Sequence, residues 1–392
     1  MNKIIFTEEF CQPENLHPFT LTRQIQDIRV GILTIREKWE MMLGLPSFDK
    51  KEDDYKDLDR SVNIDEAVGD DICFIIHGNV LPTPKLIKII KQLKNGEFIS
   101  VKGDEGIVFR FSKNEIAQKH KIKVSRAVTV KENIQTIQYP WDIFRLNDFA
   151  LRLDFELITA KRKSQPISKT NRVIKKSQVF IEKGAKVEHC IINANTGPVY
   201  IGKNAEVMEG CIIRGPFAMG PGACLKMGTK VYGATSVGPF SVVGGEIKNS
   251  ILFGYSNKAH DGYLGDSVIG EWCNLGAGTT NSNLKNNASE VKVWTLRGQM
   301  IAGKKCGVMM GDYSRTAINT SITTGTVAGV CCNVFGSGLT PKYIPSFSWG
   351  SDGVDRYRFE KALSDIEGWK KLKGQSISEN EKSILKYIFD NF

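Results

Sequence analysis

Residues 201–245 read IGKNAEVMEGCIIRGPFAMGPGACLKMGTKVYGATSVGPFSVVGG. An aliphatic side chain or methionine recurs at every sixth position of this stretch, at Ile201, Val207, Ile213, Met219, Leu225, Val231, Val237 and Val243. A helix repeats about every 3.6 residues and an ordinary strand about every two, so neither template fits. A six-residue repeat is typical of a parallel β-helix, in which each inward side chain stacks on its counterpart one coil along. The sequence therefore predicts a β-helix.

The repeat also sets the expected limits of this β-helix, which we place at residues 177–340. Between Glu246 and Tyr263 the six-residue pattern breaks, and we expect a polar segment to leave the coil there. Because a repeat array tends to lose its pattern at functional positions, this segment is where we look first for chemistry. Residues in phase outside the central stretch are Ile181 with Val187, Ile269 with Leu275, and Ile318 with Thr324 and Val330.

Residues 1–158 alternate between strand and helix patterns, and we expect them to form an α/β domain with a mostly parallel sheet. Residues 3–6 are a short strand candidate, and the apolar run 72–76 is typical of a buried parallel strand. A helix is expected at residues 34–44, ended by Gly44. Another follows Thr83, with Thr83 as its N-cap and Gly96 after its last turn.

A basic segment at residues 159–176 is expected to link the two domains, and residues 341–392 to form a helical extension. Seven lysines and arginines and no acid lie within residues 160–176, and they carry most of the net charge of +10. Such a patch can bind nucleic acid, but no aromatic residues are interleaved with it, so a solvated linker is favoured. In the extension, Ser378 and Glu381 predict a capping box ahead of an apolar helix stripe.

The composition is that of an ordinary globular protein, with 41% hydrophobic and 24% charged residues among 392. No apolar run reaches the roughly 18 residues that a membrane span needs, so no membrane partner is expected. The nine cysteines are scattered and have no metal-ligand spacing, and the N-terminus has too short an apolar core for a signal peptide. We therefore expect reduced thiols, no bound metal and a cytoplasmic protein.

Residues 246–265 concentrate side chains suited to catalysis and phosphate binding. His260 is a candidate general base, because histidine ordinarily titrates near neutral pH and can take a proton from an attacking amine. Lys248 is a candidate for neutralising a phosphate, and the asparagines downstream could hydrogen-bond sugar hydroxyls. A single histidine in a polar loop is more often an ordinary surface residue, so the pattern alone leaves both interpretations open.

This region closely resembles the acetyltransferase half of the bifunctional N-acetylglucosamine-1-phosphate uridyltransferase/glucosamine-1-phosphate acetyltransferase family. The matching motifs are Glu246-x-Lys248, Lys258-Ala259-His260-x-x-Tyr263-Leu264-Gly265-Asp266, Asn274-x-Gly276-Ala277-Gly278-Thr279 and Asn283. The resemblance implies a left-handed β-helix with hexapeptide repeats that assembles as a homotrimer, with each site between neighbouring subunits.

The resemblance also implies a role for each matching residue. His260 would take the proton from the sugar amine as that amine attacks the thioester of acetyl-CoA, and Glu246 would orient His260. Four residues match those that hold the sugar phosphate: Lys248, Tyr263, Asn274 and Asn283. The backbone expected to lie against the acetyl end of coenzyme A is that of Gly276, Ala277 and Gly278.

Two departures from the family pattern concern the identity of the sugar. The family has a phosphate-binding arginine one coil before the acid, and residues 215–222 contain no counterpart. Leu284 also replaces a tyrosine that follows the last asparagine of the motif.

The N-terminal domain resembles a shortened sugar-1-phosphate nucleotidyltransferase domain. The similar segments are residues 16–23, 29–33, 75–81 and 139–142, and they supply a candidate nucleotide site made of Arg23, Arg29, Asn79 and Asp142. No Gly-x-Gly-Thr-Arg loop precedes Leu16 to cradle a triphosphate. Asn79 stands where that superfamily has its magnesium-binding aspartate, and a neutral amide is a poor ligand for a hard dication. Mg²⁺ is therefore expected only if nucleotidyl transfer takes place.

These observations predict a transferase of amino-sugar or sugar-nucleotide metabolism. We expect its β-helix to transfer an acetyl group from acetyl-CoA to a phosphorylated amino sugar, beside a degenerate nucleotidyltransferase domain. One alternative is an active uridylyl or thymidylyl sugar-1-phosphate transferase whose β-helix only assembles the trimer. The other is a non-catalytic scaffold that binds a sugar nucleotide.

Overall fold

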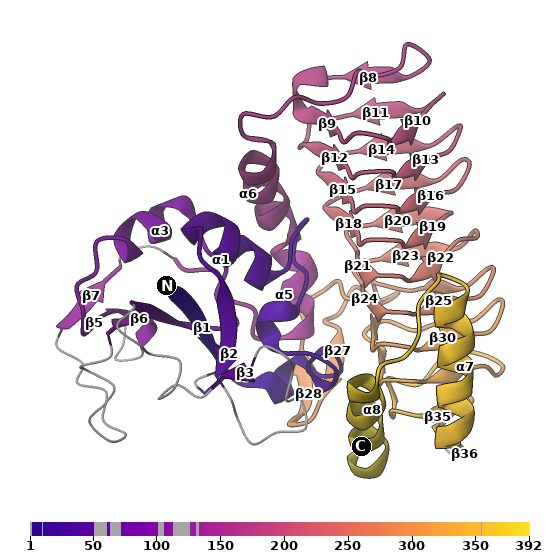
Figure 1. Ribbon diagram of the computed structural model, residues 1–392. Coiled ribbons are helices and arrows are strands. Elements are labelled where there is room, and N and C mark those ends of the chain that lie inside the picture. The colour runs from indigo at the N-terminus through magenta and orange to yellow at the C-terminus, as the bar shows by residue number, and fades with distance from the viewer. Residues whose placement is uncertain are drawn as a thin grey trace. The chain divides into compact units, whose positions relative to one another are not determined.

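The computed structural model describes residues 2–9, 11–50, 61–62, 72–100, 106–112, 126–130, 133–353 and 355–392 (Figure 1). The chain forms two compact units. The first comprises Met1–Pro13, Arg23–Ile28 and Leu33–Gln138, and the second comprises Glu14–Thr22, Arg29–Ile32 and Tyr139–Phe392. The expected boundary at residue 158 therefore differs from the observed division.

The first unit is built on one mixed sheet with the strand order β3-β2-β1-β4-β6-β5-β7. The strands are β1 (Lys3–Thr7), β2 (Ser47–Lys50), β3 (Ser61–Val62), β4 (Cys73–His77), β5 (Glu97–Ser100), β6 (Gly106–Phe111) and β7 (Arg126–Thr129). β1 pairs in parallel with both β2 and β4, whereas β6 is antiparallel to its two neighbours. Every residue of β4 is buried. The expected mostly parallel sheet and its buried strand are both confirmed.

The helices of the first unit begin where the sequence predicts. α1 (Ile35–Leu43) has a capping box between Thr34 and Glu37 and ends at Gly44, which has a positive φ of 70°. α3 (Pro84–Ile90) is capped by the Thr83 side chain but ends six residues before Gly96. The chain tightens there, because the amide of Leu93 bonds the carbonyl of Ile90 in a three-residue turn. The single-turn 3₁₀ helix η3 (Ile25–Asp27) also belongs to this unit.

The second unit is a parallel β-helix, and Figure 1 shows its strands stacked as successive coils. The first of its sheets contains β8 (Arg172–Ile174), β11 (Ile191–Asn193), β14 (Ile212–Arg214), β17 (Lys230–Tyr232), β20 (Glu246–Lys248) and β23 (Tyr263–Gly265). The second contains β9 (Val179–Ile181), β12 (Val199–Ile201), β15 (Phe217–Met219), β18 (Thr235–Val237), β21 (Ile251–Gly254), β24 (Val268–Glu271), β29 (Met309–Met310), β32 (Val327–Ala328) and β34 (Tyr343–Ile344).

A third sheet completes the coils. It contains β10 (Lys186–Val187), β13 (Glu206–Val207), β16 (Cys224–Leu225), β19 (Val242–Val243), β22 (Asn257–Lys258), β25 (Asn274–Leu275), β30 (Arg315–Thr316), β33 (Asn333–Val334), β35 (Ser348–Trp349) and the antiparallel β36 (Asp355–Arg356). A short parallel pair, β26 (Thr280–Asn281) with β31 (Ser321–Ile322), adds to the later coils. β8 lies within the segment expected to be a linker, so the coils already begin there.

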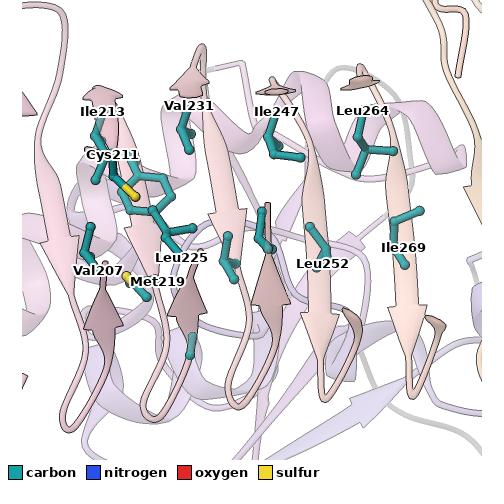
Figure 2. Packing of buried hydrophobic residues seen from close by; sticks show 14 of the residues in the cluster. Val207, Cys211, Ile213, Met219, Leu225, Val231, Ile247, Leu252, Leu264 and Ile269 are labelled. Carbon is teal, nitrogen blue, oxygen red and sulfur yellow. The ribbon is translucent and has the colours of Figure 1, made fainter. Parts of the chain in front are cut away.

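The six-residue repeat is the interior of this β-helix. All eight residues of the repeat between Ile201 and Val243 are buried in one continuous core. Figure 2 shows Val207, Ile213, Met219, Leu225 and Val231 projecting into it. Parallel register places each on its counterpart, so that Val207 pairs with Leu225 and Leu225 with Val243. The β-helix prediction is confirmed.

The break in the pattern after Glu246 is not an excursion, and that expectation was wrong. β20, β21, β22 and β23 all stay within the three sheets. The coils shorten instead: Val243 pairs with Lys258, a step three residues shorter than the one from Leu225 to Val243. This coil has fewer residues between its strands, and the strands themselves stay in the three sheets. A six-residue count therefore no longer identifies the inward positions, although the β-helix continues.

The segment that does leave the coil follows one coil later. Asn274 pairs with Arg315, far more residues away than one coil requires. The extra chain forms a hairpin of β27 (Lys292–Thr295) and β28 (Gly298–Ile301), and a bridge between Leu284 and Lys305 closes its base. The six-residue phase expected to begin at Ile318 was also wrong, because Ile318 is 69% exposed. The residues that fill the core there are Met310, Ile322, Ala328 and Val334.

Helices flank the coils of the second unit. η1 (Pro13–Leu16) and η2 (Phe19–Leu21) precede α5 (Pro140–Arg145) and α6 (Asn147–Thr159), and η4 (Lys176–Gln178) joins β8 to β9. The Asn147 side chain donates a 2.8 Å hydrogen bond to the carbonyl of Ala234 and accepts one of 3.0 Å from the Ser236 hydroxyl. These bonds explain why α6 belongs with the β-helix rather than with the first unit.

The sheets of the β-helix continue through β34, β35 and β36, past the expected end at residue 340, and only the rest of the C-terminal extension is helical, with α7 (Phe359–Lys371) and α8 (Glu379–Asn391). The capping box of Ser378 and Glu381 is present, and Ile384, Leu385 and Ile388 are buried. Lys373, just beyond α7, donates hydrogen bonds to the carbonyls of Phe240 and Tyr255. The extension is thereby fastened to the corner of two coils.

Candidate functional site

A cluster of polar residues lies on the outer face of β17, β20 and β23. Figure 2 shows that Ile247 and Leu264 point into the core. Because side chains alternate along a strand, their neighbours point outward. Parallel register aligns Lys230 with Glu246 and Glu246 with Tyr263. In the next column it aligns Tyr232, Lys248 and Gly265. The sequence-predicted residues Glu246, Lys248 and Tyr263 are therefore immediate neighbours.

This register also identifies the residues one coil before the acid. They are Lys230, beside Glu246, and Tyr232, beside Lys248, rather than any residue of the 215–222 segment. A cation is therefore present next to Glu246, although it is a lysine and not an arginine. The Lys248 ammonium lies 6.0 Å from the centre of the Tyr232 ring.

Glu246 has a partner that the sequence did not suggest. The Tyr232 hydroxyl donates a 2.7 Å hydrogen bond to its carboxylate. That bond, followed by burial and by the negative charge of Glu246, raises the pKa of Tyr232 to about 12. Within the described chain, the Glu246 carboxylate and the His260 imidazole share no hydrogen bond. The orienting role expected of Glu246 stays a prediction.

Asn283 and Tyr263 form a second part of the cluster. The Asn283 amide donates to the Tyr263 hydroxyl at 3.1 Å and also to the Asp266 carboxylate. The other oxygen of Asp266 accepts a 2.7 Å hydrogen bond from the Asn249 amide. Burial, then the nearby Asp266 carboxylate, raises the pKa of Tyr263. Asp266 was quoted in the motif without a role, and here it fixes Asn283 against Tyr263.

His260 lies in an exposed turn between β22 and β23. The backbone of this turn is tied to the next coil, because the amide of Gly278 donates a 3.2 Å hydrogen bond to the carbonyl of Asp261. The turn that carries His260 and the turn Gly276–Gly278 are therefore stacked at one corner of the β-helix. These are the two segments that the sequence assigned to the base and to acetyl-CoA.

The glycines of the second turn are also required by the fold itself. A β-carbon on Gly276 would lie 2.5 Å from the backbone of Ala317, and one on Gly278 would lie 2.1 Å from the Asn319 side chain. Gly278 has a φ of +73°, a conformation that favours glycine. Stacking of the next coil therefore accounts for both glycines, and the expected approach of coenzyme A to the Gly-Ala-Gly backbone stays a prediction.

Asn274 lies apart from the other predicted sugar-binding residues. It belongs to β25 in the third sheet, whereas Lys248 and Tyr263 belong to the first. Its side-chain oxygen accepts a 3.4 Å hydrogen bond from Asn257 one coil earlier. One chain therefore brings together three of the four predicted sugar-binding residues, and places the fourth on another face.

The four candidate nucleotide residues are divided between the two units. Arg23 and Asn79 belong to the first unit, where Asn79 is half-buried in the turn that follows β4. Arg29 and Asp142 belong to the second. The Arg29 guanidinium donates a 3.1 Å hydrogen bond to the carbonyl of Phe253, and Asp142 caps α5 by accepting one of 2.9 Å from the Tyr139 amide. Both side chains thus hold the second unit together.

The part of the chain that the structure describes contains no helix long and apolar enough to cross a membrane. All nine cysteines are free thiols, as expected.

The two units define a class of protein in which an α/β sheet domain precedes a β-helix of six-residue repeats. Residues 4–163 match the sugar nucleotidyl transferase family. The chain is 31% identical over 230 residues to a bifunctional sugar-1-phosphate nucleotidylyltransferase/acetyltransferase of Sulfurisphaera tokodaii, a match that covers 57% of this chain and 49% of that protein. The expected resemblance to the bifunctional uridyltransferase/acetyltransferase family is confirmed.

Two further similarities are to a protein sequence and to a solved structure. The bifunctional protein GlmU of Methanocaldococcus jannaschii is 32% identical over 232 residues, which is 59% of this chain and 51% of that protein. A solved Arabidopsis UDP-N-acetylglucosamine acyltransferase has 13% identity and a TM-score of 0.22, over 58% of this chain and 97% of that one. The chain spans about half the length of the curated relatives that it matches.

Proposed function

We propose that the β-helix transfers an acetyl group from acetyl-CoA to the amine of a phosphorylated amino sugar. One observation carries this proposal: the turn of His260 is stacked directly on the turn Gly276–Gly278, through the hydrogen bond between Gly278 and Asp261. A base and a thioester must be within reach of the same amine, and the stacking of these two turns at one corner supports such an arrangement. The named bifunctional relatives support the same class of reaction.

The proposed chemistry needs one base and one acceptor site. The substrate amine attacks the thioester carbonyl, the C–S bond breaks, and coenzyme A leaves as its thiol. His260 takes the proton that the amine loses and can return it to the departing sulfur. Lys248, with Lys230 beside Glu246, supplies positive charge for the phosphate of the acceptor. Tyr263 and Asn283 supply neutral hydrogen-bonding groups one coil further on.

We also propose that the complete site forms in a cytoplasmic homotrimer. Asn274 lies on a different sheet from Lys248 and Tyr263, so a neighbouring copy of the chain would be needed to bring such residues together. The first sheet also exposes Ile174, Ile191 and Ile212 on strands that precede the polar cluster. Apolar side chains of this kind favour burial against another chain. Sedimentation of a monomer at micromolar concentration would contradict the shared site.

A second candidate activity is nucleotidyl transfer by the first unit, which the match of residues 4–163 favours. Asn79 follows β4 at the position where a metal-binding carboxylate is expected, and an amide binds Mg²⁺ poorly. We therefore expect no Mg²⁺-dependent release of pyrophosphate from UTP or dTTP with common sugar-1-phosphates. Steady release would establish this activity and restore Mg²⁺ as a cofactor.

The acetyl-transfer proposal is tested by mixing the full chain with acetyl-CoA and glucosamine-1-phosphate and following the release of free thiol. Glucose-1-phosphate is the matched control, because it keeps the phosphate and lacks the amine. Thiol release that depends on the amine is the expected result. Binding can be followed separately by thermal shift, since a ligand at 100 times its Kd adds about 2.7 kcal/mol of stability. Binding of sugar nucleotides without thiol release from any amino-sugar phosphate would favour the non-catalytic scaffold.

A further inference from the structure

One residue of the β-helix core is a lysine. Lys258 lies in the inward column that runs through Val207, Leu225 and Val243, at the position that pairs with Val243. Its side chain is buried, with 1% exposure. Lysine is almost never fully buried without a compensating partner, because its ammonium loses its hydration. An aliphatic residue would continue the column, so core packing does not explain Lys258.

Among the residues that the structure describes, the ammonium of Lys258 bonds only backbone carbonyls, two in its own turn and one in the coil before it. It donates hydrogen bonds of 3.2 Å to the carbonyls of Gly244 and Asp261, and a third to the carbonyl of His260. Within the described chain, Lys258 is the only donor to the His260 carbonyl. An ammonium has three N–H groups, and these contacts use all of them.

The same turn is confined from the neighbouring coils. A β-carbon on Gly244 would lie 2.3 Å from the carbonyl of Ala259, and one on Gly245 would lie 3.0 Å from the carbonyl of His260. On the other side Gly278 bonds the carbonyl of Asp261. Lys258 therefore supplies the inner support of a turn whose outer side chain is His260. Burial lowers the pKa of Lys258 to about 8, and the Asp261 carboxylate acts in the opposite direction.

We propose that Lys258 is a positioning residue, which fixes the turn of residues 259–262 from inside the core and so sets the direction in which His260 meets its substrate. This inference rests on the proposed function for its catalytic consequence, but the support of the turn is a separate physical claim. Small displacements of a catalytic group are expensive, since about 1 Å can cost roughly 10²-fold in rate.

The test compares Lys258→Met with Val243→Ala in the full chain. Methionine keeps the length of the side chain and removes the three donors. Val243→Ala disturbs the same column one coil earlier and leaves the turn's hydrogen bonds in place. Hydrogen exchange is followed at the amides of Glu246 and Gly278, which bond the carbonyls of Gly262 and Asp261. We expect exchange at least about tenfold faster in Lys258→Met and unchanged within about twofold in Val243→Ala.

The kinetic arm separates positioning from general stability. Lys258→Met should lower kcat by about 10- to 10²-fold and change the KM of the amino sugar by less than about threefold, whereas Val243→Ala keeps kcat. Lys258→Gln retains two N–H donors, so its kcat should lie between that of the wild type and that of Lys258→Met. If Lys258→Met does not fold, Lys258→Gln takes its place in the experiment.

Two results would overturn the inference. One is exchange at the turn that does not respond to loss of the ammonium. The other is faster exchange with more than half of kcat retained. Should the wild type transfer no acetyl group, the proposed function fails, and the exchange arm still decides whether Lys258 holds the turn.

Discussion

The Tyr232 hydroxyl bonds the Glu246 carboxylate at 2.7 Å, across two adjacent coils of the β-helix. Tyr232 and Glu246 are fourteen positions apart in sequence, and the register, which pairs Tyr232 with Lys248, makes them diagonal neighbours on adjacent strands. The contact directs Glu246 along the outer face of the first sheet, where Lys230 and Tyr263 are its register neighbours. Glu246 is thus held within the polar cluster on β17, β20 and β23 by a residue from the preceding coil.

Removal of this hydroxyl is expected to weaken acetyl transfer. In Tyr232→Phe the Glu246 carboxylate loses its only protein donor in the described chain and can turn toward Lys248 or Lys230. We expect kcat/KM for the amino sugar to fall by about three- to tenfold, because a hydrogen bond to a charged group is worth about 1.5–3 kcal/mol before solvent replaces part of it.

Tyr200→Phe is the matched control for this substitution. It removes an equivalent tyrosine–glutamate bond of 2.8 Å, between Tyr200 and Glu182, on coils that precede the candidate site. That variant is expected to lose stability and keep kcat/KM. Equal kinetic losses in the two variants would mean that the Tyr232 bond only stabilises the coils.

The regular part of the fold could be predicted because its interior is repetitive. The constant spacing of eight residues between Ile201 and Val243 predicted the β-helix there and the side chains that face its interior. The spacing fails wherever a coil changes length. Lys258 falls only fifteen positions after Val243, and the hairpin separates Asn274 from Arg315. Counting by six cannot recover the register after either change.

The candidate site could be predicted only as a set of residues, not as an arrangement. Glu246, Lys248 and Tyr263 were identified by motif, and register makes them neighbours. The partners Tyr232 and Asp266 depend on the lengths of the coils between them, which no local pattern records. For Asn274 the motif was misleading, because it predicts a place beside Lys248 and Tyr263, whereas Asn274 lies on another sheet.

Val231→Asp is expected to unfold several coils. Val231 is buried in the core, and a carboxylate there has no partner and loses its hydration, which costs several kcal/mol. We expect a lower melting temperature and loss of the β signal in circular dichroism. Lys203→Asp introduces the same carboxylate at an exposed position and should melt close to wild type. A normally melting Val231→Asp would argue against the inward phase of the repeat.

Acid should destabilise the second unit through His17. This side chain is buried against Trp294, Tyr343 and Phe392, and within the described residues neither of its ring nitrogens has a hydrogen-bond partner. Burial lowers its pKa to about 4 from the ordinary 6.5. Between these values the unfolded chain binds a proton that the folded chain does not, so stability is complete above pH 6.5 and falls as the pH drops toward 4.

The expected loss from His17 is about 2 kcal/mol at pH 5, and it should be absent in His17→Phe. Urea unfolding at pH 7 and pH 5, followed by tryptophan fluorescence, measures this difference. His77, whose pKa is also lowered to about 4 by burial, will leave a residual acid dependence in the variant. An unchanged pH dependence in His17→Phe would show that His17 is not a source of acid lability.

Replacement of Lys248 should affect substrate binding more than turnover. Its ammonium is proposed to contact the phosphate in both the ground state and the transition state, so Lys248→Ala should raise the KM of the amino-sugar phosphate by about tenfold or more and leave kcat within about threefold. An amino sugar without phosphate should not distinguish the variant from wild type. A fall in kcat with unchanged KM would show that Lys248 acts at the reacting centre and not on the phosphate.

His260→Ala should abolish most of the acetyl transfer and little else. A positioned general base supplies about 10²- to 10⁴-fold in rate, so kcat should fall by that factor. The Kd of acetyl-CoA should stay nearly constant, because the base meets the amine and not the cofactor. Glu246→Gln should cost less than His260→Ala, since Glu246 is expected only to orient or charge the imidazole. His189→Ala is the matched control, because His189 is also an exposed histidine in a turn of the β-helix. If His260→Ala and His189→Ala each keep more than half of the wild-type rate, His260 is a surface histidine, and the proton of the amine must leave by another route.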